Sequence, residues 1–126
     1  NKRTNKMTTN EMLIEHVTQI VHDLENGIII TQEEMDDSYY DYDMYCAGDM
    51  VTAFDYLEGI LDINYIISSD KQYIGAKICV AFGGPNIYID TQEQVVYGYW
   101  GSDKAVLSYI NDIMGIDDAL EELYNC

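Results

Sequence analysis

Carboxylates are the side chains of this chain that could do chemistry, since it contains 23 Asp and Glu residues but only 6 Lys and Arg. They are concentrated between positions 33 and 62, a stretch without any base. The ten carboxylates of that stretch are Glu33, Glu34, Asp36, Asp37, Asp41, Asp43, Asp49, Asp55, Glu58 and Asp62. Such groups could transfer protons, ligate a cation or bind a basic partner.

Aromatic side chains form a second group of candidate contacts. Tyrosines are interleaved with the acids, and the run from Tyr97 to Gly101 holds three aromatic rings in five residues. Tyr and Trp are favoured anchors of interfaces, although strands also use them for packing. The candidate aromatic contacts are Tyr39, Tyr40, Tyr42, Tyr45, Tyr99 and Trp100.

The spacing of possible ligands does not indicate a metal site. An EF-hand loop starting at Asp41 would need Gly at its sixth position and Glu at its twelfth, but these are Cys46 and Thr52. His16 and His22 are separated by about 240° around a helix, so they do not share the face that a zinc helix requires. We therefore expect no metal and no cofactor.

Catalysis is not indicated either, because the many carboxylates carry no distinguishing motif. No pattern supplies a base and an orienting residue for Cys46, Cys79 or Cys126, as a cysteine nucleophile requires. Gly83-Gly84-Pro85-Asn86 is not followed by Lys-Ser or Lys-Thr, so it indicates a hairpin turn and not a phosphate loop. We predict that the protein is not an enzyme.

Helices are predicted in the first half of the chain. Thr8 and Glu11 have capping-box spacing, and apolar residues then recur at helical spacing until Gly27. Thr31 and Glu34 repeat the capping-box spacing, and we predict a second helix through the acidic stretch. Between these two helices, residues 28–30 are either a strand or a packed connector. Asp49 is the expected cap of a helix that runs to about Leu61.

Four β-rich runs follow, separated by turn residues. They are Ile63–Ser68, Tyr73–Phe82, Asn86–Asp90 and Gln94–Trp100. Ser102 is the expected cap of a helix that Gly115 ends, and Asp117–Tyr124 is the last predicted helix. The order ααββββαα predicts an α+β fold, with a four-stranded antiparallel meander and helices packed on it.

We expect residues 1–8 to be a flexible basic leader and residues 9–126 to be a single acidic domain. The length allows a sizeable core, and 48% of the residues are hydrophobic. No apolar stretch approaches the ~18 residues of a membrane span. An odd number of cysteines without a CxxC pair is typical of a reducing compartment, so we predict a cytoplasmic protein.

The net charge of −17 has three interpretations. It could be a solvated surface without a specific role, the adaptation of a halophile, or a surface for a basic partner. The content of Ile, Asn, Tyr and Met argues against a halophile. Direct binding of nucleic acid is disfavoured, because phosphate contacts need Lys and Arg and only Lys71, Lys77 and Lys104 follow Met7.

Carboxylates at i, i+3, i+4 and i+7 would form a row on a helix, with ~5–6 Å between neighbours. Duplex DNA carries one negative charge per ~1.7 Å of its axis. In composition and in the 33–62 segment, the chain resembles the small acidic DNA-mimic proteins of phages and mobile elements, the antirestriction and anti-CRISPR inhibitors. The stretches 82–92 and 98–103 also resemble uncharacterised small proteins of gut Firmicutes and their mobile elements.

The first resemblance implies an inhibitor that occupies the basic surface of a DNA- or RNA-binding nuclease in host defence. An alternative is a regulatory module that binds a protein or a small ligand through an aromatic sheet face around Tyr88, Tyr97, Tyr99 and Trp100. The sequence leaves the oligomeric state open.

Overall fold

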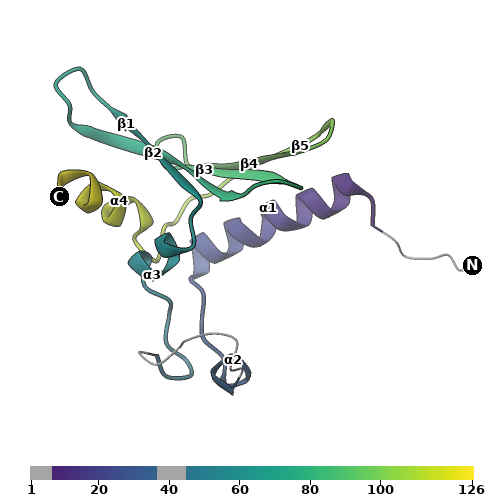
Figure 1. Cartoon of the computed structure of the whole chain (residues 1–126). Helices are drawn as coiled ribbons and strands as arrows, with labels where there is room; N and C mark the ends of the chain where they lie inside the picture. Colours follow the sequence, from purple (N-terminus) through teal and green to yellow (C-terminus); the bar gives the residue numbers. More distant parts are fainter. Residues whose placement is uncertain (1–6, 37–44) are drawn as a thin grey trace, which may run out of the picture.

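The computed structural model describes residues 7–36 and 45–126 and has an α+β fold (Figure 1). Its elements are α1 (Thr9–Asn26), α2 (Gln32–Asp36), α3 (Ala53–Glu58), β1 (Asp62–Ile67), β2 (Tyr73–Ala81), β3 (Asn86–Asp90), β4 (Val95–Trp100), β5 (Asp103–Ser108) and α4 (Ile116–Asn125). The predicted fold class is confirmed, but the sheet has five strands where we expected four. The expected leader lies outside the described residues as far as Lys6.

Helix α1 begins as the sequence predicts. Thr8 N donates to Glu11 Oε1 at 2.9 Å, and Glu11 N donates to Thr8 Oγ1 at 3.1 Å, which completes the capping box. Gly27 ends the helix with a φ of 83°, a left-handed value that favours glycine. The buried stripe of the helix consists of Leu13, Val17, Val21 and Leu24.

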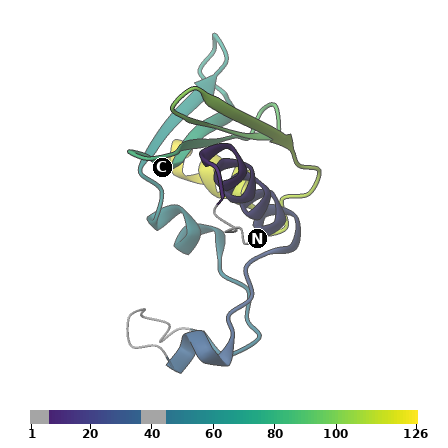
Figure 2. The same cartoon turned by 90° about the vertical axis from the view of Figure 1, so that its right-hand side faces the viewer.

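The five strands pair antiparallel in the order β1-β2-β3-β4-β5. Helix α1 packs on β4 and β5, and α4 packs on β2, so both helices cover the same face of the sheet (Figures 1 and 2). The core lies between these two layers. Its fully buried side chains include Leu13, Ile78, Ile87, Ile89, Val96, Ile116 and Leu120.

The prediction of a helix after Ser102 is wrong, because residues 103–108 form strand β5. Gly101 and Ser102 make a two-residue turn in which Gly101 has a φ of 62°, and Trp100 pairs with Asp103 directly across it. Such a tight turn returns the chain alongside β4 as a hairpin. The short apolar run from Ala105 to Leu107 fits the periodicity of a helix as well as that of a strand. The turn therefore decides between strand and helix.

The predicted helix from Asp49 to Leu61 is shorter and starts later than expected. Thr52 is its cap, because Thr52 Oγ1 accepts from Asp55 N at 3.2 Å. The Asp49 carboxylate instead accepts from Cys46 N at 2.8 Å and closes a turn. Residues 28–30 are a connector with one isolated bridge, which joins Ile29 to Met50.

The other predicted helices agree with the structure where it describes them. Helix α2 starts with the predicted capping box, in which Glu34 N donates to Thr31 Oγ1 at 3.1 Å. Its predicted continuation through residues 37–44 lies outside the described residues. Helix α4 matches the predicted last helix within one residue at each end. Among the residues that the structure describes, no helix has both the length and the hydropathy to cross a membrane.

Candidate functional site

An acidic arm projects from the body of the molecule, on the side away from the sheet (Figures 1 and 2). We use this name for the segments 28–36 and 45–51, which carry α2. Three backbone hydrogen bonds of 2.8 Å join the two segments: Ile30 N to Asp49 O, Gly48 N to Ile30 O, and Val51 N to Ile28 O. These bonds hold α2 at a distance from the helices that pack on the sheet.

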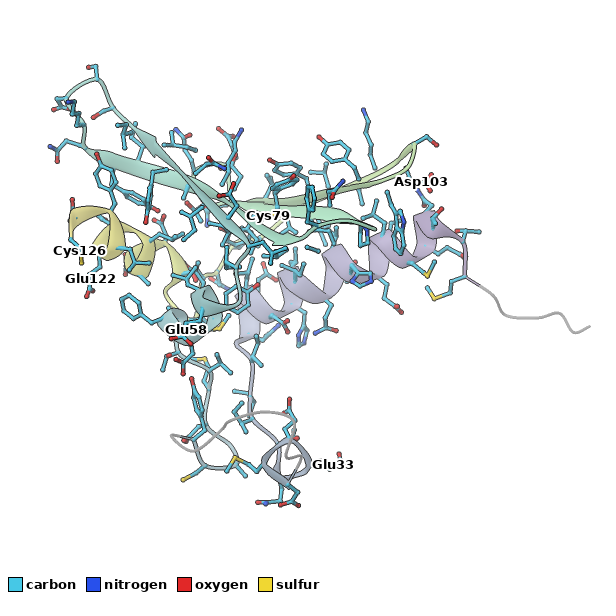
Figure 3. All side chains as sticks on the ribbon, viewed as in Figure 1. Glu33, Glu58, Cys79, Asp103, Glu122 and Cys126 are labelled. Carbon is cyan, nitrogen blue, oxygen red and sulfur yellow. The ribbon has the colours of Figure 1, made fainter. Side chains whose placement is uncertain are left out.

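The carboxylates of α2 do not all play the same part. Glu34 Oε1 accepts from Thr31 N at 2.9 Å within the capping box, and Asp36 Oδ1 accepts from Gln32 Nε2 at 3.0 Å. Glu33 is exposed and lies on the arm, well away from the sheet (Figure 3). Glu34 and Asp36 therefore help to build α2, whereas Glu33 presents its charge to solvent.

Tyr45 and Asp55, one aromatic and one acidic candidate, meet at the base of the arm. The Tyr45 hydroxyl donates to Asp55 Oδ2 and accepts from Thr52 N at 2.9 Å. This contact ties the returning segment of the arm to the first turn of α3. Both residues thus hold the arm in place.

Six of the predicted contacts lie outside the described residues. They are Asp37, Tyr39, Tyr40, Asp41, Tyr42 and Asp43. Asp62 is described, but it starts β1 and pairs with Cys79, so the structure places it at the border of the sheet and away from α2.

The described lysines lie in the sheet and its first turn, whereas carboxylates occur both in the helices and in the sheet. None of the four helices that the structure describes contains Lys or Arg. Lys77 and Lys104 lie in β2 and β5, and Lys71 lies in the β1–β2 turn. In the described residues, no Lys or Arg nitrogen lies within 4.0 Å of a carboxylate, and His22 Nδ1 is 3.9 Å from Asp23 Oδ1. The helical carboxylates are Glu11, Glu15, Asp23, Glu25, Glu33, Glu34, Asp36, Asp55, Glu58, Asp117, Asp118, Glu121 and Glu122.

A groove with an acidic rim lies between α3 and α4, which pack together. Asp118 and Glu122 line one side of it, one helical turn apart on α4. Met50, Phe54 and Met114 are among its apolar lining residues. Glu58 on α3 and Glu122 on α4 are on the same side of the sheet (Figure 3). A long basic side chain fits this chemistry, because its stem is apolar and its head is cationic.

Other carboxylates stabilise the fold itself. Asp112 accepts from the backbone N–H groups of Gly115, Ile116 and Asp117 at 3.1, 2.8 and 2.9 Å, and so caps the start of α4. Asp90 is 5% exposed and accepts from the N–H groups that follow it in the β3–β4 turn. Sequence reasoning missed Asp112, because it lies three residues before the N-cap position Gly115, outside the spacing at which a capping residue is recognised.

The face of the sheet opposite the helices carries aromatic and basic side chains. Residues directly paired across antiparallel strands share a face, so Cys79, Tyr88, Tyr97 and Val106 form one row. The rings of Tyr88 and Tyr97 stack with centroids 5.3 Å apart, and Tyr99 meets Tyr97 edge-on at 6.0 Å. No described element covers this face (Figure 2), which we call the open sheet face.

Lys77 and Lys104 also lie on the open sheet face, because Lys77 pairs with Asp90 and Lys104 pairs with Tyr99. Trp100 does not lie there. It is on the helix-covered face, packed against the core and in edge contact with His16 at 6.2 Å. The alternation of strand β4 could have shown this, since Trp100 is one residue out of phase with Tyr97 and Tyr99.

Three tyrosines near the helices have raised pKa values. Burial, with a smaller effect of the Asp23 carboxylate, raises the pKa of Tyr56 to about 12. Burial and the hydrogen bond to Asp117, at 2.6 Å, raise the pKa of Tyr73. Burial also raises the pKa of Tyr109. These hydroxyls stay protonated at neutral pH and carry no charge into the acidic helices.

Within residues 7–36 and 45–126, no group of three or more His, Cys, Asp or Glu side chains is arranged to hold a metal ion. Comparison with protein-family models, with curated proteins and with solved structures finds no match to this chain.

Proposed function

We propose that this chain is a non-enzymatic acidic binding protein that occupies the nucleic-acid-binding surface of another protein, in the first place a host defence nuclease of the restriction or CRISPR type. The observation that carries the proposal is the absence of Lys and Arg from the described helices. The carboxylates of the four described helices have no Lys or Arg among them, while the described lysines lie in the sheet or its first turn.

A surface that carries one sign of charge favours partners that carry the opposite charge. The helical carboxylates attract a channel lined by Lys and Arg, and such steering accelerates association at low salt. Nucleic acid itself is repelled, because its phosphates carry the same sign as the carboxylates. A basic channel that evolved for phosphates is therefore the natural complement of these helices.

The groove between α3 and α4 adds a specific contact to the general attraction. Asp118 and Glu122 are spaced to meet one guanidinium or ammonium group, and the apolar lining around Phe54 can cover its stem. We expect an Arg or Lys of the partner to enter this groove. Glu33, Glu58 and Glu122 are then charges whose reversal weakens binding.

The test is displacement of labelled duplex DNA from purified restriction and CRISPR nucleases at low salt, followed by fluorescence anisotropy. We expect the chain to displace DNA from a susceptible nuclease and to lose potency as salt rises. Glu122→Lys should reduce its affinity roughly 10- to 100-fold, as reversal of a close interfacial charge costs on the order of 1.5–3 kcal/mol.

The matched control is Glu93→Lys, which makes the same charge change in the exposed β3–β4 turn. It should change affinity less than about threefold. If Glu93→Lys and Glu122→Lys weaken binding equally, net charge alone is responsible and the groove is not the site. If the chain displaces DNA from no nuclease tested, the proposal is wrong.

The stacked tyrosines of the open sheet face favour a second candidate function, that of a regulatory module that binds a protein or small ligand there. Tyr99 is 42% exposed beside the Tyr88–Tyr97 stack. A hollow at the border of this face is lined by Leu61, Phe82 and Tyr88. If this function holds, Tyr99→Ala should weaken binding of the partner more than Glu122→Lys does.

A further inference from the structure

Among the residues that the structure describes, strand β5 is an edge of the sheet, and half of its backbone hydrogen-bonding groups have no strand to pair with. It pairs with β4 on one side only. Tyr109 N donates to Gln94 O at 3.0 Å, so Tyr109 directs its backbone groups toward β4. Along an antiparallel strand these directions alternate. The N–H and C=O groups of Lys104, Val106 and Ser108 therefore point away from the sheet.

Exposed apolar side chains line this edge. Val106 is 67% exposed, Leu107 is 40% exposed, and Ile110, just beyond the strand, is 82% exposed. Ile110 N donates to Glu25 Oε2 at 2.8 Å, which places Glu25 of α1 beside it. Ile14 is 48% exposed and lies on the same line of α1 as Glu25, eleven residues earlier. An edge strand flanked in this way is a site for pairing with another strand.

The opposite edge of the sheet also exposes apolar side chains, but its strand is irregular. Strand β1 begins with Asp62 and contains a register shift between Ile66 and Ile67, and such irregularities hinder further pairing. Strand β5 has a continuous register from Val95–Ser108 to Trp100–Asp103 and no proline. The two edges therefore differ in their capacity to accept a strand.

The charges near β5 also distinguish it from the rest of the surface. Lys104 is exposed, and the adjacent carboxylates are engaged, since Asp103 accepts from Thr9 Oγ1 at 2.8 Å and Glu25 accepts from Ile110 N. Two copies of a chain with a net charge of −17 repel each other through their acidic helices. Lys104 adds a positive charge at the β5 edge, which lessens the repulsion that a second copy meets there.

We propose that β5 pairs antiparallel with β5 of a second copy, in the symmetric register that places Val106 opposite Val106 of that copy. In this register Lys104 lies opposite Ser108 of the second copy, so all three outward-facing residues donate and accept a hydrogen bond. A register centred on Lys104 would oppose two like charges, and one centred on Ser108 would leave Lys104 without a partner. The pair is isologous and closes as a dimer with a continuous sheet.

This proposal does not depend on the proposed function. The acidic groove involves α3 and α4, and α4 packs on β2, which is separated from β5 by β3 and β4. Adjacent strands are ~4.8 Å apart, so a partner in the groove and a second copy at β5 do not compete for one surface.

Sedimentation equilibrium of the full chain at about 0.15 M salt tests the proposal, because exposed charges are then screened beyond ~8 Å. We expect a dimer whose dissociation constant rises at least about 100-fold in Val106→Glu, since the two introduced carboxylates would face each other. Ile67→Glu makes the same change at the β1 edge, where Ile67 is 42% exposed, and should leave the dimer intact. Circular dichroism checks that both variants remain folded.

A charge-swap mixture tests the register. Val106→Lys should be monomeric alone, like Val106→Glu, and a mixture of the two should form heterodimers. A wild-type chain that stays monomeric up to its solubility limit overturns the proposal. A dimer that persists in Val106→Glu also overturns it, and so do two variants that fail to associate when mixed. In either case the β5 edge would be a site for an extended segment of another protein.

Discussion

The helices on one side of the sheet carry Asp and Glu with no Lys or Arg among them, whereas the opposite side carries Lys77 and Lys104 among stacked tyrosines. Both surfaces belong to one small fold and share one core. Within the described residues, no helical carboxylate forms an ion pair with Lys or Arg, so these carboxylates remain available to a basic partner. A chain with the same composition and intermixed charges would neutralise part of that surface itself.

The largest predicted effect comes from breaking the packing that keeps the two sides apart. Leu13 of α1 is fully buried against the sheet. Leu13→Ala should destabilise the protein by about 2–5 kcal/mol, since it removes buried methyl groups and leaves a cavity. Urea unfolding followed by circular dichroism measures the loss.

Thr18→Ala is the matched control on the exposed side of α1. It should change the free energy of unfolding by less than about 0.5 kcal/mol. If the two variants are destabilised equally, the buried stripe of α1 does not hold the helix on the sheet. The contrast between the helical side and the open sheet face would then lack its structural basis.

The second prediction concerns alkaline pH, at which the tyrosine hydroxyls near the acidic helices titrate. The folded pKa of Tyr56 is about 12, against an ordinary value of 10.0. Between these values the unfolded chain releases the proton and the folded chain retains it. The stabilisation is therefore fully present below pH ~10 and is lost as pH rises through about 12, a change of roughly 3 kcal/mol.

Unfolding by urea at several pH values between about 9 and 12 measures this loss. Tyr56→Phe should unfold with a flatter pH dependence, because the titrating hydroxyl is gone. Tyr73 and Tyr109 also have raised pKa values and will keep part of the slope. A slope that is the same in Tyr56→Phe and in the wild type would contradict the assignment.

The third prediction separates carboxylates that stabilise the fold from those that present charge. Asp112 accepts three backbone hydrogen bonds at the start of α4. Asp112→Ala should cost about 1–2 kcal/mol, as for the loss of a helix cap. Glu121→Ala, at an exposed position of the same helix, should cost less than about 0.5 kcal/mol. Thermal unfolding distinguishes them, and equal losses would show that Asp112 is not a cap.

Sequence patterns predicted the elements that local chemistry determines. The capping boxes at Thr8 and Thr31 and the strands up to Trp100 follow from spacing and turn residues. Strand β5 was missed because Val106 and its neighbours are apolar at both helical and strand spacing, and only the turn at Gly101 decides between them. The acidic candidates were visible from composition. The sequence did not show that Lys77 and Lys104 lie on the open sheet face, because their placement depends on the register of five paired strands.

The smallest predicted effects come from exchanging one charge on each side. Glu122 follows Asp118 by one turn near the end of α4, where like charges repel and a cation is favoured by the helix dipole. Glu122→Lys should stabilise the protein by about 0.5 kcal/mol. Lys77 is paired with Asp90 across the sheet, and Lys77→Glu should destabilise by a similar amount, because like charges would then be opposed.

Thermal unfolding at low and high salt measures both effects, and Glu93→Lys, which changes the net charge as Glu122→Lys does but lies in the β3–β4 turn, is the control for a general effect of net charge. Glu122→Lys and Lys77→Glu change the net charge in opposite directions, and both effects should shrink as salt screens the charges. A more stable Glu122→Lys variant that also fails to displace DNA would separate binding from folding, because the loss of binding could not follow from damage to the fold. If Lys77→Glu is neutral or stabilising, the pairing of Lys77 with Asp90 is unimportant, and the contrast between the two sides rests on the helices alone.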